Sequence, residues 1–107
     1  MAKIIGIHPL ELRDNVQAET LETFCRNELL PAVSALPGTK ARLFKGDKGA
    51  RNGKYLLLFE FDKAEQRDQF FVEEAQASEL VKEVWKQWPK LGTLVTNEFS
   101  DYVELIA

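Results

Sequence analysis

The stretch from Gly53 to Asp62 is the longest nearly unbroken apolar run in the chain, and it limits the possible folds more than any other feature. Its tyrosine, leucines and phenylalanines hardly alternate with polar residues, which is typical of a central strand with apolar side chains on both faces. Both faces of the sheet must then be covered. A chain of 107 residues has enough helix for one face only, so we expect a partner subunit to cover the other.

Length and composition predict one domain over residues 1–107, with 45% hydrophobic residues available for a core. The net charge of −3 supplies no excess of positive charge for phosphates, so we expect no nucleic-acid partner. The apolar stretch near the N-terminus is too short for a signal peptide, and no segment is long enough to span a membrane. Cys25 cannot form an internal disulfide, and its apolar neighbours favour a core position over a reactive thiol. We therefore expect a cytoplasmic protein.

Apolar periodicity predicts four strands and two helical regions, separated by segments rich in glycine or proline. In order, they are a strand over Lys3–Leu12, a helix from Asp14 or Asn15 to about Leu36, a strand over Lys40–Lys45, a hairpin loop over Gly46–Gly53, the central strand, a helical region from Asp62 to Pro89 or Gly92, and a strand over Leu94–Ile106. Pro9 is expected to end the first strand near His8 or to create a bulge or edge position. Pro31 is expected to kink the first helix. Ser78 is expected to cap a second helical segment, and the last strand to be interrupted around Ser100–Asp101.

This order, strand, helix, strand, strand, helix, strand, is that of an α+β protein with a ferredoxin-like, four-stranded antiparallel sheet. With apolar residues on both sheet faces, the chain resembles the dimeric α+β-barrel superfamily, which includes the antibiotic-biosynthesis monooxygenase, stress-responsive barrel, EthD and NIPSNAP types. The resemblance rests chiefly on Leu29–Gly38 and Tyr55–Asp62. It implies that two subunits pack their sheets face to face, and that the last strand often reaches across to the partner. It implies no single activity, because the superfamily contains enzymes and binding proteins.

Polar strand residues can be sorted by sheet face, because side chains alternate along a strand. In the first strand His8 shares a face with Ile4 and Gly6, opposite Ile5 and Ile7. We expect the purely apolar faces to lie under the helices. The polar residues would then face the space between the two sheets, where the resembling superfamily has its pockets. By elimination, this polar set is His8, Arg42, Glu60 and either Tyr102 or Glu104.

A histidine, an arginine and a carboxylate that converge in an apolar cleft can bind an anionic or polar aromatic ligand. His8, the only histidine, is the candidate catalytic base, and Arg42, Glu60 and Tyr102 are the candidate ligand-binding residues beside it. The alternative is that Arg42 and Glu60 pair across adjacent strands, while His8 satisfies a backbone carbonyl or contacts solvent. In either case each buried charge needs a partner.

Trp85 and Trp88 lie three residues apart on the second helical segment, where they either line a ligand channel or belong to the core or an interface. The haem-degrading branch of the resembling superfamily implies a strand asparagine, a helix tryptophan and a helix histidine. Here the helix lacks histidine, and the first strand has His8 instead of asparagine, so the resemblance does not extend to that activity. No cluster has metal-ligand spacing, and no glycine-rich segment has the context of a phosphate loop, so we expect no metal and no cofactor.

Two hypotheses follow for the function. In the first, the protein is a small homodimer in which each subunit has a pocket between sheet and helices. The pocket binds a small, partly apolar molecule, or oxidises it in the manner of a cofactor-independent monooxygenase, without a bound metal. In the second, the protein is a non-catalytic structural or protein-interaction module of the same fold. A barrel filled by side chains, or candidate residues that point outward, would favour the second hypothesis.

Overall fold

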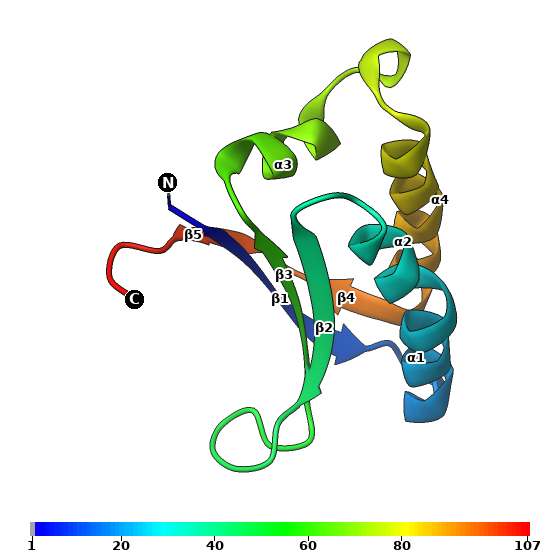
Figure 1. The fold of residues 1–107 in the computed structure, drawn as a ribbon. Helices are drawn as coiled ribbons and strands as arrows, with labels where there is room; N and C mark the ends of the chain where they lie inside the picture. The colour runs from blue at the N-terminus through cyan, green and yellow to red at the C-terminus, as the bar shows by residue number, and fades with distance from the viewer. Residues whose placement is uncertain (1) are drawn as a thin grey trace.

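An antiparallel sheet with helices on one side forms the body of the molecule in the computed structural model, which describes residues 2–107 (Figure 1). The strands are β1 (Ile4–Leu12), β2 (Thr39–Lys45), β3 (Tyr55–Phe61), β4 (Val95–Asn97) and β5 (Ser100–Val103). Their order is β2-β3-β1-β4, and β5 also pairs with β1. The helical elements are α1 (Ala18–Phe24), the π-helical turn η1 (Cys25–Leu29), α2 (Leu30–Ser34), α3 (Ala64–Asp68), the 3-10 turns η2 (Gln69–Phe71) and η3 (Glu74–Gln76), and α4 (Glu79–Leu94). The predicted α+β, ferredoxin-like fold is confirmed.

The central strand predicted from the apolar run is β3, which lies between β2 and β1 and pairs antiparallel with both. Its alternate side chains point to opposite faces, as the pleat of a strand requires. Those of Tyr55, Leu57, Phe59 and Phe61 are buried under the helices, on the side that we call the helix face. The predicted hairpin between β2 and β3 is also present, with Lys45 opposite Tyr55 at its end.

The other side of the sheet, the open face, consists mainly of half-buried apolar side chains in β1 and β3. They are Ile5, Ile7, Pro9, Leu56 and Leu58. Within residues 2–107 no helix covers this face, and the hairpin loop and the C-terminal segment project from the same side (Figure 1). The sheet is therefore apolar on both faces, as the sequence predicts.

Pro9 explains why the last strand is divided into β4 and β5. Both pieces pair with β1 in one continuous register, and the gap falls at Glu98 and Phe99, slightly before the predicted interruption. Glu104 donates its backbone N–H to the carbonyl of Lys3 at 3.0 Å, so the odd-numbered residues of β1 direct their hydrogen bonds toward this edge. Pro9 is one of these odd-numbered residues, and the register places it opposite Glu98. Because proline has no backbone N–H, it cannot donate the hydrogen bond that this pair would otherwise form. The ladder therefore breaks at that residue.

The first helical region begins later than predicted. Gln17 is the residue before α1, and neither Asp14 nor Asn15 caps the helix, because Asn15 has a φ of 67° and belongs to the preceding turn. The expected irregularity at Pro31 is present as the π-helical turn η1, in which the N–H of Leu30 donates to the carbonyl of Cys25. The wider turn comes just before the proline, which lacks its own N–H.

The second helical region begins and ends differently from the prediction. The residue before α3 is Lys63 rather than Asp62, and its N–H donates to Oε1 of Gln66 at 3.1 Å. Ser78 caps α4 as predicted, since its Oγ accepts the N–H of Val81. The predicted end at Pro89 or Gly92 is wrong, because α4 continues to Leu94. Packing of its last turns against the core outweighs the one hydrogen bond that a proline removes.

Candidate functional site

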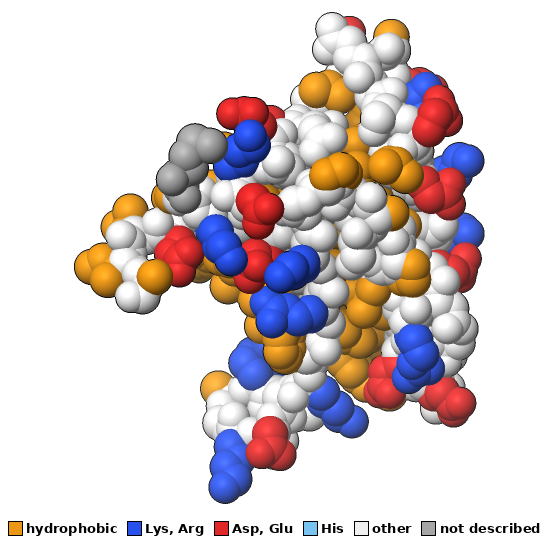
Figure 2. Space-filling view, viewed as in Figure 1, with side chains coloured by type: hydrophobic (Ala, Val, Ile, Leu, Met, Phe, Trp, Pro, Cys, Tyr) orange, Lys and Arg blue, Asp and Glu red, His pale blue; other side chains and the backbone are white. Residues whose placement is uncertain are grey.

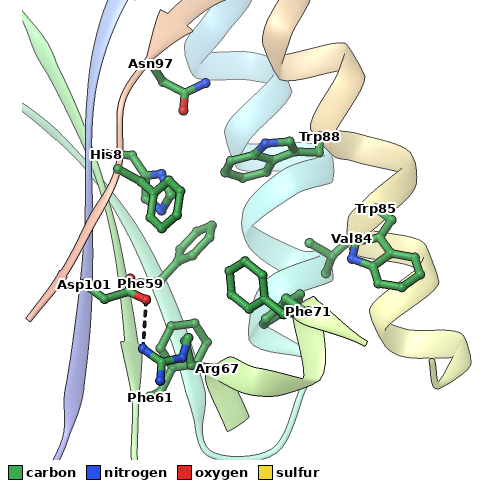
Figure 3. Close-up of a pocket in the computed structure, with 12 residues that line it drawn as sticks. His8, Phe59, Phe61, Arg67, Phe71, Val84, Trp85, Trp88, Asn97 and Asp101 are labelled. Atoms are coloured by element: carbon green, nitrogen blue, oxygen red, sulfur yellow. Dashed lines mark hydrogen bonds and ion pairs between the residues drawn. The ribbon is translucent and has the colours of Figure 1, made fainter. Parts of the chain in front are cut away.

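A cavity of about 220 Å³ lies on the helix face, between the sheet and the elements α3, η2 and α4 (Figure 3). Most of its lining is apolar and aromatic. Among these side chains are Phe59, Phe61, Phe71, Val84, Trp85 and Trp88. The polar residues that line it are His8, Arg67, Asn97 and Asp101. An apolar cavity with a few polar groups in its wall is the usual form of a small-molecule site.

His8 forms part of the sheet-side wall of this cavity and is only 5% exposed. Its imidazole is surrounded by aromatic rings, with centroid distances of 4.9 Å to Phe59, 5.4 Å to Trp88 and 5.8 Å to Phe99. In the described part of the chain its Nδ1 atom is buried without a hydrogen-bond partner. An unsatisfied buried polar atom costs about 1–3 kcal/mol, so it requires an explanation.

Burial lowers the pKa of His8 from 6.5 to about 4, and the negative charge of Asp101 opposes this effect only in part. The imidazole is therefore neutral at physiological pH, with one N–H to donate and one nitrogen to accept. A base with this pKa is weaker than the near-neutral one that the sequence suggested.

Gly6 provides the room in which His8 and Asp101 approach each other. A Cβ atom at this position would lie 3.0 Å from Oδ1 of Asp101 and 3.8 Å from Nε2 of His8. The register of β1 with β5 places Asp101 directly opposite Gly6. The carboxylate of Asp101 and the imidazole of His8 therefore lie beside the same residue without a side chain, together with Cβ of Phe59 at 3.6 Å.

Arg67 holds Asp101 from the opposite wall. Its Nη1 atom lies 3.0 Å from Oδ2 of Asp101 (Figure 3). Its Nε atom lies 2.7 Å from Oδ1 of Asp68. These two hydrogen bonds raise the pKa of Arg67 further above its ordinary value. The ion pair connects α3 with β5 across one end of the cavity.

The structure brings together three of the predicted site residues, His8, Trp85 and Trp88, in a cavity on the helix face. Of these, His8 is the one expected between two sheets. The predicted placement of His8 is therefore wrong. Alternation along β1 correctly groups His8 with Ile4 and Gly6, but polarity predicts that this face points away from the helices. His8 instead lies under the helices, where its neutral imidazole packs among aromatic side chains.

The other predicted residues, Arg42, Glu60 and Tyr102, lie on the open face and do not converge with His8. The register places Glu60 opposite Ile5 in β1, and Tyr102 also opposite Ile5 from the other side. Glu60 forms ion pairs with Arg42 at 3.4 Å and with Lys3 at 3.3 Å. The alternative prediction, that Arg42 and Glu60 pair across adjacent strands, is confirmed. The predicted combination of His8 with an arginine and a glutamate is not formed.

Several side chains in the cavity wall were not singled out from the sequence. They are Phe59, Arg67, Phe71, Asn97, Phe99 and Asp101. Asp101 and Phe99 could have been found by extending the antiparallel register from the first strand to the last. Arg67 gives no such signal, because the position of α3 over the sheet depends on the whole chain.

The remaining candidate features carry no chemistry of their own. Cys25 is fully buried, and burial raises the pKa of its thiol to about 11, which agrees with the predicted core position. Over residues 2–107 no group of three or more His, Cys, Asp or Glu side chains is arranged to hold a metal ion. In the same range, none of the helices has the length and apolar character needed to cross a membrane.

Comparison with known proteins identifies the fold but no closer relative. No protein-family model matches the chain, and no curated protein matches its sequence. Among solved structures, SnoaB from Streptomyces nogalater, a cofactor-independent oxygenase, matches with a TM-score of 0.73 and 8% identity over 100% of this chain and 97% of that one. A dimeric protein of unknown function and ferredoxin-like fold from Bacteroides fragilis matches with a TM-score of 0.59 and 19% identity over 94% of both chains.

A NIPSNAP family protein from Agrobacterium tumefaciens matches with a TM-score of 0.63 and 14% identity, over 98% of this chain and 86% of that one. These matches confirm the predicted resemblance to the α+β-barrel proteins as a likeness of fold. Identities this low say nothing about which reaction, if any, the chain performs.

Proposed function

We propose that the chain forms a homodimer in which each subunit binds a small, largely aromatic molecule in the cavity beside His8. Dimerisation is supported by the open face, whose half-buried apolar side chains need a second layer. It is further supported by the dimeric state of the structurally similar Bacteroides protein. In this arrangement Arg42, Glu60 and Tyr102 belong to the interface or its rim, and His8, Trp85 and Trp88 to the ligand site.

One observation carries the ligand-binding proposal: His8 is buried in the wall of an aromatic cavity, and within residues 2–107 its Nδ1 atom has no hydrogen-bond partner. A purely structural core would gain stability from an apolar side chain at this position, since the unsatisfied nitrogen is costly. A ligand that forms a hydrogen bond with the other ring nitrogen, Nε2, would explain why a histidine is retained here despite this cost. An engineered apolar cavity of about 150 Å³ is known to accommodate benzene, so about 220 Å³ suits a somewhat larger ring system.

A second candidate function, oxidation without a cofactor, is supported by the similarity to SnoaB across the whole chain. An activated CH₂ group beside two aromatic rings would give up a proton, and the resulting anion would reduce O₂. Loss of water from the hydroperoxide then leaves a carbonyl, so that CH₂ and O₂ become C=O and H₂O. His8 would accept the first proton. Its lowered pKa restricts this reaction to substrates whose anion is well stabilised.

Calorimetric titration with naphthylmethanol, a neutral aromatic alcohol, tests the binding proposal. His8→Phe preserves a ring but removes both nitrogens, so we expect about three- to tenfold weaker binding, the value of one hydrogen bond. Val84→Phe places an additional ring inside the cavity and should abolish binding, and circular dichroism checks that the variant folds. Naphthylmethanol binding that neither substitution changes would place the site elsewhere.

Oxygen uptake with dithranol, an anthrone, tests the second candidate function, which fails if His8→Phe consumes oxygen as fast as the wild type.

A further inference from the structure

The charged groups at the cavity do not favour an anionic ligand. Of the residues that line the cavity, Arg67 and Asp101 are charged and pair with each other, and Arg67 also pairs with Asp68, whose side chain is 60% exposed and lies outside the lining. His8 adds no positive charge at physiological pH, because burial keeps its imidazole neutral. The arginine that was expected beside it, Arg42, lies on the open face. An anion that entered the cavity would therefore meet a carboxylate and no uncommitted cation among the residues lining it.

The aromatic lining of the cavity also favours a cation over an anion. The faces of phenylalanine and tryptophan rings carry partial negative charge and attract cations that are held away from water. Phe59, Trp88 and Phe99 surround His8, and Phe61 lies 6.3 Å from Phe59 between ring centroids. The cavity thus combines aromatic walls with a carboxylate at one end. Arg67 binds this carboxylate through Oδ2 at 3.0 Å, so Oδ1 is the oxygen that can bind an organic cation.

We propose that the cavity selects an aromatic or arylalkyl primary amine, and that the ammonium group binds over Gly6 between Asp101 and His8. This inference rests on the proposed ligand-binding function and specifies the class of ligand. The two acceptors converge there, with Oδ1 of Asp101 3.0 Å and Nε2 of His8 3.8 Å from the position of the missing Cβ. An ammonium group has three N–H donors, so it can bind both atoms at once.

The tautomer of His8 fits this arrangement. When Nδ1 carries the proton, Nε2 has a free lone pair that can accept an N–H from the ligand. The Nδ1–H group then points among aromatic rings, where weak N–H···π contacts are the available interaction. A hydroxyl ligand has a single proton and can satisfy only one of the two acceptors. The amine is therefore the better match for the site.

Three probes of similar shape test the proposal by calorimetry with the full chain at neutral pH: naphthylmethylamine, naphthylmethanol and naphthoic acid. We expect the amine to bind at least about tenfold more tightly than the acid, since one charge-assisted hydrogen bond is worth that much. In Asp101→Asn, which keeps the size of the side chain but removes its charge, the preference for the amine over the acid should disappear. Glu65→Gln removes the same charge from an exposed side chain of α3 and should leave the preference unchanged.

Each outcome decides a separate point. If the acid binds as tightly as the amine, or if Asp101→Asn keeps the preference, the amine proposal is wrong while the cavity remains a ligand site. If Glu65→Gln abolishes the preference as Asp101→Asn does, the effect is one of overall charge and the amine proposal is again wrong. If none of the three probes binds to the folded wild-type protein, the ligand-binding proposal itself is wrong, and the amine proposal with it.

Discussion

The ring of Phe99 stacks on the imidazole of His8, with centroids 5.8 Å apart and an interplanar angle of 25°. The two residues lie opposite each other in the register of the sheet, at the point where the ladder between β1 and the last strand is interrupted. Phe99 is itself 55% exposed, so it separates His8 from solvent.

Replacing Phe99 by alanine should raise the pKa of His8 from about 4 toward its ordinary value of 6.5, because burial is the main cause of the shift. An NMR titration of the imidazole protons of this single histidine measures the effect directly. Leu105→Ala, in the exposed C-terminal segment, is the control and should leave the titration unchanged. An unaltered pKa in Phe99→Ala would show that other groups desolvate His8.

The stability of the protein should depend on pH through His8. Its pKa is lower in the folded chain than in the unfolded chain, so the unfolded state binds the proton first as the pH falls. The contribution of neutral His8 to the free energy of unfolding is fully present above about pH 6.5 and is lost progressively as the pH falls to about 4. This loss is on the order of 3 kcal/mol.

Urea unfolding at several pH values measures this dependence, and comparison with His8→Phe removes the contribution of the carboxylates. The difference in free energy of unfolding between the two proteins should change across this window and stay constant above it. If the difference in free energy of unfolding between the wild type and His8→Phe is the same at every pH, His8 has the same pKa in the folded and the unfolded protein.

Replacing Gly6 by alanine should disturb Asp101 more than the backbone. The new Cβ would lie 3.0 Å from Oδ1 of Asp101, so the carboxylate must move away and weaken its bond to Arg67. We expect a loss of about 0.5–1 kcal/mol of stability, the usual value for a partly exposed ion pair. A double-mutant cycle with Asp101→Asn checks the cause. If Gly6→Ala destabilises the Asp101→Asn protein as much as the wild type, the carboxylate is not responsible.

Placing a charge on the open face should separate the proposed dimer. Leu58 is half-buried at the centre of this face, opposite Ile7, and Leu58→Glu would bring a carboxylate into the interface. Sedimentation of the wild type at low micromolar concentration should give twice 12.2 kDa, and the variant should give 12.2 kDa. Lys48→Glu in the exposed hairpin loop is the control and should remain dimeric. A wild-type protein that sediments as a monomer would contradict the proposed assembly.

Much of the fold follows from local patterns in the sequence. The apolar run of β3, the glycine-rich hairpin and the Ser78 cap each depend on neighbouring residues, and the structure contains all three. Helix ends were less predictable. The last turns of α4 pass Pro89 because tertiary packing outweighs the loss of one hydrogen bond, and no local pattern reports such packing.

The candidate site was predicted only in part, for a related reason. Alternation along a strand shows which residues share a face, but it does not show which face the helices cover. Polarity predicts the wrong face for His8, because a neutral imidazole can be buried among aromatic rings. Arg67 and Asp101 come from elements 34 positions apart, and only the assembled structure brings them together.

The missing N–H of Pro9 also determines where the edge of the sheet can accept changes of side chain. The residues opposite the interruption, Glu98 and Phe99, are free of ladder hydrogen bonds, while the short strands on either side hold the edge in register. Substitutions at this two-residue segment can therefore reshape the wall beside His8 without weakening the rest of the sheet. On the face drawn in Figure 2, side chains of both charges lie close together, and apolar side chains are exposed between such groups. A single proline thus separates the part of the sheet edge that keeps the strands in register from the part that forms the cavity wall.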